Sequence, residues 1–391
     1  MQFTIVIPTL NRADVLHLSL NSVMRQKGTH AFNVIISNNR SEDGTSTYVK
    51  SITDNRIKYV EPDRRLSMSR HWEYAAQFVD TTNENSLVMF LGDDDILNVN
   101  AFNIATHIFS KYEVDALRRN TGYYYTPDCP HRNAGFLFLP PLDGALTIRN
   151  SMDVLKRVAA GELSYGELPM LYHGFIRATL LTRLLGYGPL FQKAAPDVYS
   201  NFSLAALNIK YASLNYPLTL GVATPKSNGV NFYLNTSIRD DFVRTSAHEL
   251  RHRYPIDSAY LHILESLETV IDNHQIDVEI NYRRWYTNLI HFEDFATICR
   301  NLSYIKSIFG KHWITIYFES CVWGLVRLKR IVPKRQAFII KKIVSAVFRL
   351  RSKTASVAYT GDLRKIGIND PNGCMDFIEG RVSINIDGLA P

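Results

Sequence analysis

The chain has 391 residues, of which 46% are hydrophobic and 21% charged, a composition typical of globular proteins. This length predicts two domains, or one large domain with an appendage. The four cysteines are scattered without the spacing of a disulfide framework or a metal site, which favours a reducing compartment. The first residues lack the pattern of a signal peptide, and no run reaches the roughly 18 apolar residues of a membrane-spanning helix. We therefore expect a cytoplasmic protein.

The net charge of +7 is concentrated near the C-terminus. No acidic residue lies between Glu319 and Asp362, where basic residues alternate with apolar ones such as Ile339 and Val344. This pattern predicts an amphipathic helix, interrupted at Pro333, that lies on an anionic membrane surface. Its density of apolar residues argues against nucleic acid as the partner. The alternative is a basic, solvated face packed on a helical bundle.

The N-terminal residues show the strand and helix alternation of a parallel sheet. A buried strand over 3–7 ends in a polar loop at 9–12, and a helix is predicted over 13–27. A second strand over 32–37 ends in the polar run 38–45. The pattern predicts a Rossmann-type α/β sheet, whose ligands bind at the carboxyl ends of the strands. The motifs GxGxxG and GxxxxGKS/T are absent, which argues against a dinucleotide fingerprint or a P-loop.

An acidic run follows another buried strand. Residues 87–92 are apolar and end in Gly92, and Asp93, Asp94 and Asp95 come directly after them. Three adjacent carboxylates raise one another's pKa, so they must be solvated, paired or neutralised by a cation. A divalent cation with oxygen ligands suits them, and Mg²⁺ typically combines one or two carboxylates with substrate phosphates. The structural alternative is an acidic turn in which Asp95 caps a helix.

Four short motifs occur in an order that resembles family 2 glycosyltransferases, namely VIPTLNR, SNNRSEDGT, SMSRHWEYA and FLGDDDIL. The similarity covers residues 1–235 and implies a GT-A fold in an inverting enzyme of the bacterial surface-polysaccharide type. It implies that Arg70 lies near a diphosphate and that Asp94 and Asp95 bind Mg²⁺ or Mn²⁺. The nucleotide-binding residues that it implies are Pro8, Thr9, Asn11, Arg12, Asn38, Arg70 and Asp93.

Two positions depart from the family pattern. The family usually has Asp at the position of Asn38, where it reads the imide N–H of uracil. An amide can accept but also donates, so the identity of the base is left open. The acidic motif usually has Asp at the position of Gly92, which makes Asp94 the first choice of metal ligand and Asp95 the second.

The candidate catalytic base is Asp197, which follows Pro196 at the start of a predicted helix. A carboxylate at this position stabilises the first turn of a helix. The resemblance implies that an inverting enzyme keeps its base at the same place, and the two interpretations are compatible. Glu167 and Asp143 are the other candidates for the base.

Two further residues and one long loop are candidates for the rest of the site. His173 could bind a metal or the acceptor, although a lone histidine is more often part of the core. Lys226, in a predicted turn, could approach the phosphates. Residues 126–144 are predicted to form a long loop, which is either an acceptor-facing lid or a disordered insertion.

The predicted α/β fold is a GT-A-like nucleotide-binding sheet over 1–235, followed by an all-α appendage over 236–312. Residues 313–391 are predicted to hold the basic amphipathic helices and a tail of no assigned role. The predicted reaction is metal-dependent transfer of a sugar from a nucleoside diphosphate sugar to a hydroxyl of a glycan or lipid-linked acceptor, in surface polysaccharide synthesis at the inner face of the membrane. The alternatives are a nucleotidyltransferase and a non-catalytic, membrane-associated assembly protein with a degenerate GT-A domain.

Overall fold

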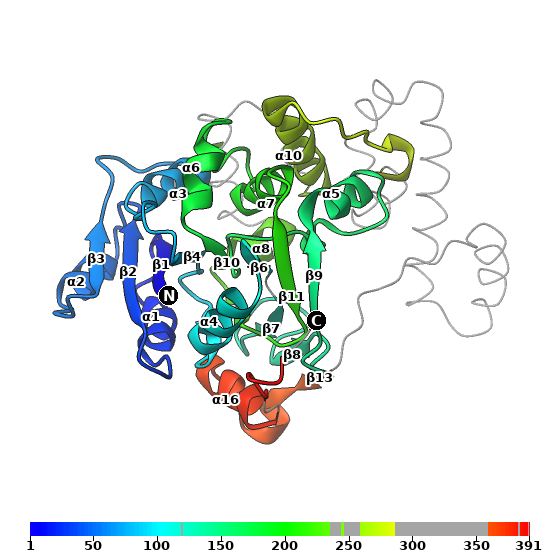
Figure 1. Ribbon diagram of the computed structural model, residues 1–391. Helices are drawn as coiled ribbons and strands as arrows, with labels where there is room; N and C mark the ends of the chain where they lie inside the picture. The colour runs from blue at the N-terminus through cyan, green and yellow to red at the C-terminus, as the bar shows by residue number, and fades with distance from the viewer. Residues whose placement is uncertain (119, 235–243, 246–258, 286–358, 382–383, 390) are drawn as a thin grey trace, which may run out of the picture.

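The computed structural model describes residues 1–118, 120–234, 244–245, 259–285, 359–381, 384–389 and 391 (Figure 1). The predicted amphipathic segment and most of the predicted helical domain lie outside these residues, so the contact with a membrane stays a prediction. Across the described part of the chain, no helix is both long and apolar enough to cross a bilayer.

The larger of two sheets has the strand order β3-β2-β1-β4-β10-β6-β11-β9. Its first four strands are parallel, as the alternation of strands and helices predicted. Antiparallel pairing of β10 with β4 and of β9 with β11 makes the sheet mixed. The strands are β1 (Gln2–Thr9), β2 (Ala31–Asn38), β3 (Ile57–Val60), β4 (Ser86–Phe90), β6 (Ala116–Arg118), β9 (Leu146–Asn150), β10 (Phe175–Arg177) and β11 (Lys210–Leu214).

Helices cover both faces of this sheet. Along β1, Val6 packs into the core on one face, while Ile5 and Ile7 pack into the core on the other. Since both faces are covered, β1 is apolar from Ile5 to Ile7 and β4 from Leu87 to Phe90, without alternating polar residues. The helices described in this region are α1 (Leu16–Met24), α2 (Thr45–Lys50), α3 (Met68–Ala76), α4 (Ala101–Lys111), α5 (Ser151–Ala159), α6 (Thr179–Leu185), α7 (Pro196–Ala206) and α8 (Asn228–Leu234).

The smaller sheet has the order β13-β8-β7-β12-β5 and begins where the acidic run ends. Its first strand in the chain, β5, follows Asp95 directly, so the acidic run connects the two sheets. Backbone pairing of β12 with both β5 and β7 brings residues 219–223 beside that connection. The strands are β5 (Ile96–Leu97), β7 (Thr121–Tyr125), β8 (Phe136–Leu139), β12 (Thr219–Ala223) and β13 (Tyr359–Asp362).

The predicted long loop over 126–144 is wrong in its central part, which forms β8. Phe136 to Leu139 pair with β7 on one side and with β13 on the other. Leu137 and Leu139 are buried, whereas Phe136 and Phe138 are partly exposed, and this alternation is typical of a strand with one covered face. The Pro, Asn and Gly residues around the strand masked this pattern in the sequence.

The C-terminal residues return to the N-terminal part of the fold. After β13, the helix α16 (Pro371–Arg381) packs against α1 and β12 (Figure 1). Cys374, Met375 and Ile378 are buried with residues of the smaller sheet. The segment to which the sequence assigned no role therefore supports the sheet beside the acidic run. Before it, α10 (Ala259–His274) packs against α7, which confirms that helical structure follows the α/β domain.

Candidate active site

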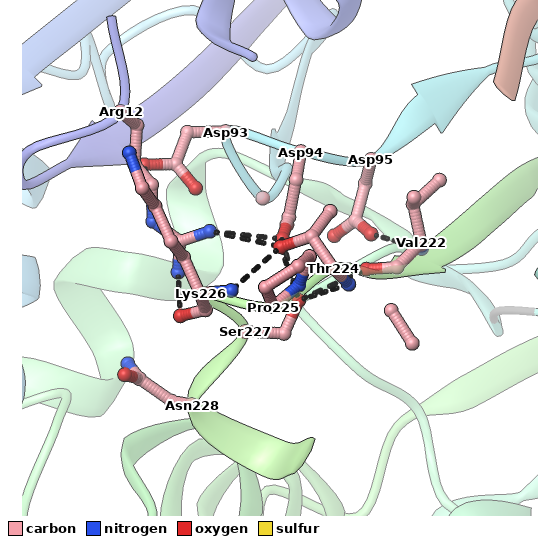
Figure 2. Close-up of polar contacts among 12 residues, drawn as sticks. Arg12, Asp93, Asp94, Asp95, Val222, Thr224, Pro225, Lys226, Ser227 and Asn228 are labelled. Atoms are coloured by element: carbon pink, nitrogen blue, oxygen red, sulfur yellow. Dashed lines mark hydrogen bonds and ion pairs between the residues drawn. The ribbon is translucent and has the colours of Figure 1, made fainter. Parts of the chain in front are cut away.

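The acidic run lies at the carboxyl end of β4, as expected for a ligand site in a parallel sheet. Asp93, Asp94 and Asp95 are each less than one-tenth exposed. Asp93 and Asp94 share Arg12 as a partner, whereas Asp95 accepts a hydrogen bond from the Val222 N–H (Figure 2). Asp95 therefore has a different role in the fold from its two neighbours in the sequence.

Asp95 is held inside the protein. The Tyr172 hydroxyl donates to Asp95 Oδ2 at 2.7 Å, His173 Nε2 lies 2.9 Å from the same oxygen, and the Val222 N–H donates to Oδ1 at 2.8 Å. Burial acts to raise the pKa of Asp95, but these partners outweigh burial and lower it below the usual value. Asp95 is therefore a charged anchor between β5, β12 and the segment before β10.

His173 supports Asp95 from behind. Its backbone is in the left-handed region at φ 67°, and its Nδ1 lies 2.8 Å from Thr219 Oγ1 while Nε2 faces Asp95. Both ring nitrogens thus have partners within the protein. This geometry favours the interpretation of His173 as a core histidine over a metal ligand or an acceptor contact.

Gly92 departs from the family pattern for a steric reason. A Cβ atom at this position would overlap Asp95 Oδ2 and would lie 2.7 Å from the Tyr172 hydroxyl. The contact between Tyr172 and Asp95 therefore requires glycine at position 92. An aspartate there would displace the anchor.

Asp94 faces the loop that follows β12. The Ser227 hydroxyl donates to Asp94 Oδ2 at 2.8 Å, Thr224 Oγ1 lies 3.4 Å from it, and Arg12 Nη1 donates to it at 3.1 Å (Figure 2). Burial and the charges of the neighbouring carboxylates raise the pKa of Asp94 to about 7, against the opposing effect of Arg12. Burial also raises the pKa of Asp93, whose Oδ2 lies 4.0 Å from Arg12 Nε.

Arg12 connects three segments that are distant in the sequence. In addition to Asp94, its guanidinium donates to the Lys226 carbonyl at 2.7 Å (Figure 2). Its own loop is fixed by the next loop at this edge of the sheet, since Ser41 Oγ accepts from the Asn11 N–H and Asn11 Oδ1 accepts from the Glu42 N–H. The loops after β1, β2 and β12 therefore form one hydrogen-bonded unit around the acidic run.

A cavity of about 990 Å³ opens over this unit. It contains most of the residues that the sequence predicted for the site. The predicted residues that line it are Pro8, Thr9, Asn11, Arg12, Asp93, Asp94, Asp95, His173, Asp197 and Lys226. Lys226 lies at the rim, where its Nζ is 3.0 Å from Asp14 Oδ2 and nearly half of its side chain is exposed.

Asn38 does not line this cavity. Its side-chain amide donates to Ser46 Oγ at 2.7 Å and to Tyr59 Oη at 2.9 Å, and its Oδ1 accepts from the Ser41 N–H. The next residue, Asn39, lines the cavity instead. The side chains of adjacent residues at the end of a strand point to opposite sides. Asn38 is therefore buried while Asn39 faces the cavity, and moving the end of β2 by one residue would exchange the two. Base recognition by Asn38 remains a prediction.

Arg70 also lies outside the cavity lining. Helix α3 turns His71 and Trp72 toward the interior, which leaves Arg70 exposed on the other side. Arg65, in the loop before α3, lines the cavity. Arg65 is thus the better placed of the two to meet an anionic ligand, and the role of Arg70 near a diphosphate stays a prediction.

Of the three candidate bases, Asp197 is the one that lines the cavity. It sits in the first turn of α7, directly after Pro196. Glu167 is engaged elsewhere, because Arg118 Nη2 and Arg149 Nη1 lie 2.9 and 2.7 Å from its oxygens. The carboxylate of Asp143 accepts from the Asn215 amide and the Ala145 N–H on the surface.

Two carboxylates of the acidic run fit a divalent cation better than the third. Asp93 and Asp94 fit, since both carboxylates line the cavity and the pKa of each is raised. In the described contacts, Arg12 is the basic side chain that lies against both of them. Asp95 fits less well, because both of its oxygens already accept hydrogen bonds. No group of three or more His, Cys, Asp or Glu side chains in the described residues has the arrangement of a complete protein-only metal site.

Several residues of the site were not predicted from the sequence. Tyr172, Thr224, Ser227 and Arg65 lie at the acidic run or line the cavity. The hydroxyl donors reach Asp94 from 130 or more residues away, and a single Thr or Ser carries no signal for such a contact. Tyr172 could have been suspected from its position beside His173.

Residues 4–125 match the family model described as Glycosyl transferase family 2. These residues form a family 2 glycosyltransferase domain. The match runs from β1 to β7 and includes the loop at Thr9 to Arg12 and the acidic run, whereas Asp197 and Lys226 lie beyond it. The resemblance read from the sequence motifs is thus confirmed. The chain is a glycosyltransferase with a GT-A-like α/β fold.

The family 2 domain and the rest of the chain also align with solved structures of low sequence identity. TarS 1-349 of S. aureus in complex with UDP-GlcNAc is 14% identical with a TM-score of 0.48, and the alignment covers 86% of this chain and 82% of that chain. The mannosyltransferase PcManGT from Pyrobaculum calidifontis, in complex with GDP-Man and Mn²⁺, is 14% identical with a TM-score of 0.40, and the alignment covers 83% and 86%. Comparison with curated proteins found no match.

Proposed function

We propose that this glycosyltransferase moves a sugar from a nucleoside diphosphate sugar to a hydroxyl group of a glycan or lipid-linked acceptor, with inversion at the anomeric carbon, in surface polysaccharide synthesis. The observation that carries the proposal is one cavity lined by the acidic run, by Arg12 and by Asp197. A diphosphate leaving group needs positive charge, and an acceptor hydroxyl needs a base. The cavity offers both.

The donor diphosphate would lie beside Arg12, Arg65 and Lys226. All three line the cavity, and a planar guanidinium binds phosphate oxygens through two parallel N–H donors. Arg12 is fixed in place by Asp94 and the Lys226 carbonyl, so it is oriented before any ligand arrives. The loop at Pro8 to Asn11 and the Asn39 amide border the same space and would contact the nucleoside.

Asp197 would accept the proton of the acceptor hydroxyl. As that proton moves to Asp197 Oδ, the acceptor oxygen bonds to the anomeric carbon, the bond from this carbon to the diphosphate oxygen breaks, and the electron pair leaves with the nucleoside diphosphate. Attack opposite the leaving group inverts the anomeric carbon. The position in the first turn of α7 places the N-terminal end of the helix dipole beside the carboxylate, which favours its charged form.

Asp94 and Asp93 would hold Mg²⁺ or Mn²⁺, with Asp95 as their anchored neighbour. When bound, such a cation supplies charge neutralisation for the departing diphosphate. Asp95, with Tyr172 and His173, would keep the turn at Asp94 rigid. The family resemblance implies Asp94 and Asp95 as ligands, whereas the hydrogen bonds of Asp95 favour Asp93 as the second one.

The deciding experiment is calorimetric titration with UDP, GDP, CMP and dTDP, with and without Mn²⁺. The wild type is compared with Asp94→Asn and with Asp143→Asn, which removes a surface carboxylate outside the cavity. We expect one nucleoside diphosphate to bind in a metal-dependent way, to lose affinity in Asp94→Asn and to keep it in Asp143→Asn. Absence of metal-dependent binding for every nucleotide would contradict the proposal.

A turnover assay separates the transferase from the nucleotidyltransferase. In one assay the bound nucleotide is supplied as its sugar conjugate with a panel of oligosaccharide acceptors, and in a second assay it is supplied as the nucleoside triphosphate with a sugar 1-phosphate. The released product of each assay is analysed. A glycosyltransferase releases a nucleoside diphosphate, whereas a nucleotidyltransferase acting on a nucleoside triphosphate releases pyrophosphate. Release of pyrophosphate would overturn the proposed reaction while leaving the nucleotide site in place.

A further inference from the structure

An aromatic wall lines the cavity on the side of the smaller sheet. It consists of Tyr123 and Tyr125 of β7 and His131 of the turn that follows β7. Successive side chains of a strand point to opposite faces. Accordingly, Tyr124 is buried in the core below the sheet, while its two neighbours face the cavity.

Tyr123 leans toward the acidic run. In the parallel register of β7 and β12 it pairs with Gly221, and a Cβ atom at Gly221 would lie 3.1 Å from two atoms of the tyrosine ring. The ring therefore lies across β12 at a place where there is no side chain. The next residue of β12, Val222, donates its N–H to Asp95. Two strand spacings, about 10 Å, separate β7 from β5, which starts at the acidic run.

Tyr125 and His131 form a rigid pair beside Tyr123. Their rings are stacked, with centroids 4.7 Å apart and an interplanar angle of 20°. The turn that carries His131 is closed by backbone hydrogen bonds from Gly135 to Tyr125 and from Ala134 to His131. Burial and the charge of Arg132 lower the pKa of His131, so its imidazole is neutral at pH 7.

Tyr123 is 45% exposed although its position is fixed by the packing of its ring on Gly221. A large aromatic side chain that is held in place by packing and left exposed inside a cavity is typical of a ligand-binding position. The cavity volume lies at the upper end of the roughly 300–1,000 Å³ of single-ligand pockets, which leaves room for a second ligand beside the donor.

We infer that Tyr123, Tyr125 and His131 form the subsite for a carbohydrate ring of the acceptor. A pyranose presents an apolar C–H face that packs on an aromatic ring, and its hydroxyls bond to groups at the ring edges, here the tyrosine hydroxyls and the imidazole. The inference rests on the proposed function, and it selects a glycan acceptor over a bare lipid or a protein. The nucleoside is assigned to the opposite side of the acidic run, at the loops after β1 and β2.

The test is binding of a defined oligosaccharide panel to the full-length chain, measured by saturation-transfer difference NMR in the presence and absence of nucleotide. The panel contains di- to hexasaccharides of hexose, N-acetylhexosamine and deoxyhexose. The variants are Tyr123→Ala and Tyr123→Phe, and the control is Tyr187→Ala. Tyr187 is also 45% exposed but lies outside the cavity lining.

We expect at least one oligosaccharide to bind, Tyr123→Ala to weaken it about tenfold or more, and Tyr123→Phe to stay within about threefold of wild type because the ring is kept. The glycan affinity of Tyr187→Ala should equal that of wild type. The nucleotide affinity should be the same in all variants. Equal glycan affinity of wild type and Tyr123→Ala, or no glycan binding at all, would overturn the assignment. Loss of nucleotide affinity in Tyr123→Ala would reassign the wall to the donor base.

These outcomes are distinct from failure of the proposed function. If no nucleotide binds but the glycan response depends on Tyr123, the subsite stands and the transferase chemistry fails. If nucleotides bind with metal and glycans do not bind, the donor site stands and the carbohydrate subsite fails.

Discussion

Arg12 Nη1 lies 3.1 Å from Asp94 Oδ2 and joins the loop after the first strand to the acidic run between the two sheets. The same guanidinium holds the Lys226 carbonyl at 2.7 Å, so one side chain connects the donor-side loop with the segment after β12. Both Arg12 and Asp94 are largely buried. Removing Arg12 would leave two largely buried carboxylates, Asp93 and Asp94, without their charged partner.

The variant Arg12→Gln tests this relationship. We expect it to lower the free energy of unfolding by about 3 kcal/mol, because a buried carboxylate loses its charged partner. The free energy of unfolding of Arg12→Lys should lie between those of Arg12→Gln and wild type, since a lysine keeps the charge but cannot make two directed contacts. The measurement is urea unfolding followed by circular dichroism.

The control for Arg12 is Arg25→Gln. Arg25 is half exposed and lies 3.9 Å from Asp376, so its loss should change stability by less than about 1 kcal/mol. If Arg12→Gln and Arg25→Gln unfold at the same urea concentration, the buried contact of Arg12 does not stabilise the fold.

Gly92→Ala is predicted to disturb the anchor of the acidic run. The new Cβ would overlap the Asp95 carboxylate, and overpacking of a filled site typically costs about 1–3 kcal/mol. Gly380→Ala is the control, because a Cβ there meets no atom within 4 Å and alanine is favoured in the helix α16. Thermal unfolding should show a lower midpoint for Gly92→Ala and an equal or higher midpoint for Gly380→Ala. The opposite order would contradict the steric explanation of Gly92.

The arrangement of the first strands and of the acidic run could be predicted because the signals are local. Apolar runs that end in polar loops predict parallel strands, and the carboxyl-edge rule brings Arg12 and Asp94 to one place without any knowledge of distant contacts. The strand at Phe136 was missed because its two neighbours, β7 and β13, are more than 230 residues apart, and its apolar face is covered by distant residues such as Met375 and Ile378.

The different roles of Asp94 and Asp95 within the acidic run could not be predicted. Asp94 and Asp95 are adjacent and chemically identical, and they differ because their partners come from different segments. Tyr172 and Val222 bind Asp95, whereas Ser227 binds Asp94. The direction of the Asn38 side chain could not be predicted from the sequence either, since it depends on where β2 ends to within one residue.

Asp197→Asn is predicted to lower the turnover number of the proposed reaction by about 10²- to 10⁴-fold, because an amide cannot accept the proton of the acceptor hydroxyl. Nucleotide affinity should stay within about threefold of wild type, since the loss concerns the proton transfer. Asp143→Asn, another candidate from the sequence, should keep full turnover, because Asp143 lies outside the cavity. Steady-state assays of nucleoside diphosphate release measure both variants. Wild-type turnover in Asp197→Asn would remove Asp197 from the role of base.

The last prediction concerns the pH dependence of stability through His71. This imidazole is buried under the cavity with Nε2 2.9 Å from Ser37 Oγ, and burial lowers its pKa to about 3. An unfolded histidine titrates near pH 6.5, so between about pH 6.5 and 3 the unfolded state binds the extra proton and stability falls as the pH falls. From pH 7 to pH 5 this group should remove about 2 kcal/mol from the free energy of unfolding.

His71→Gln is the matched variant, because the glutamine amide can reach Ser37 with a nitrogen in place of Nε2 but does not titrate. Urea unfolding at pH 5, 6 and 7 should show a shallower loss of stability in His71→Gln than in wild type, while all other titrating groups are shared by the two proteins. Parallel stability curves over this range would mean that the folded protein accommodates the charged imidazole, and that the cavity floor at His71 is open to water.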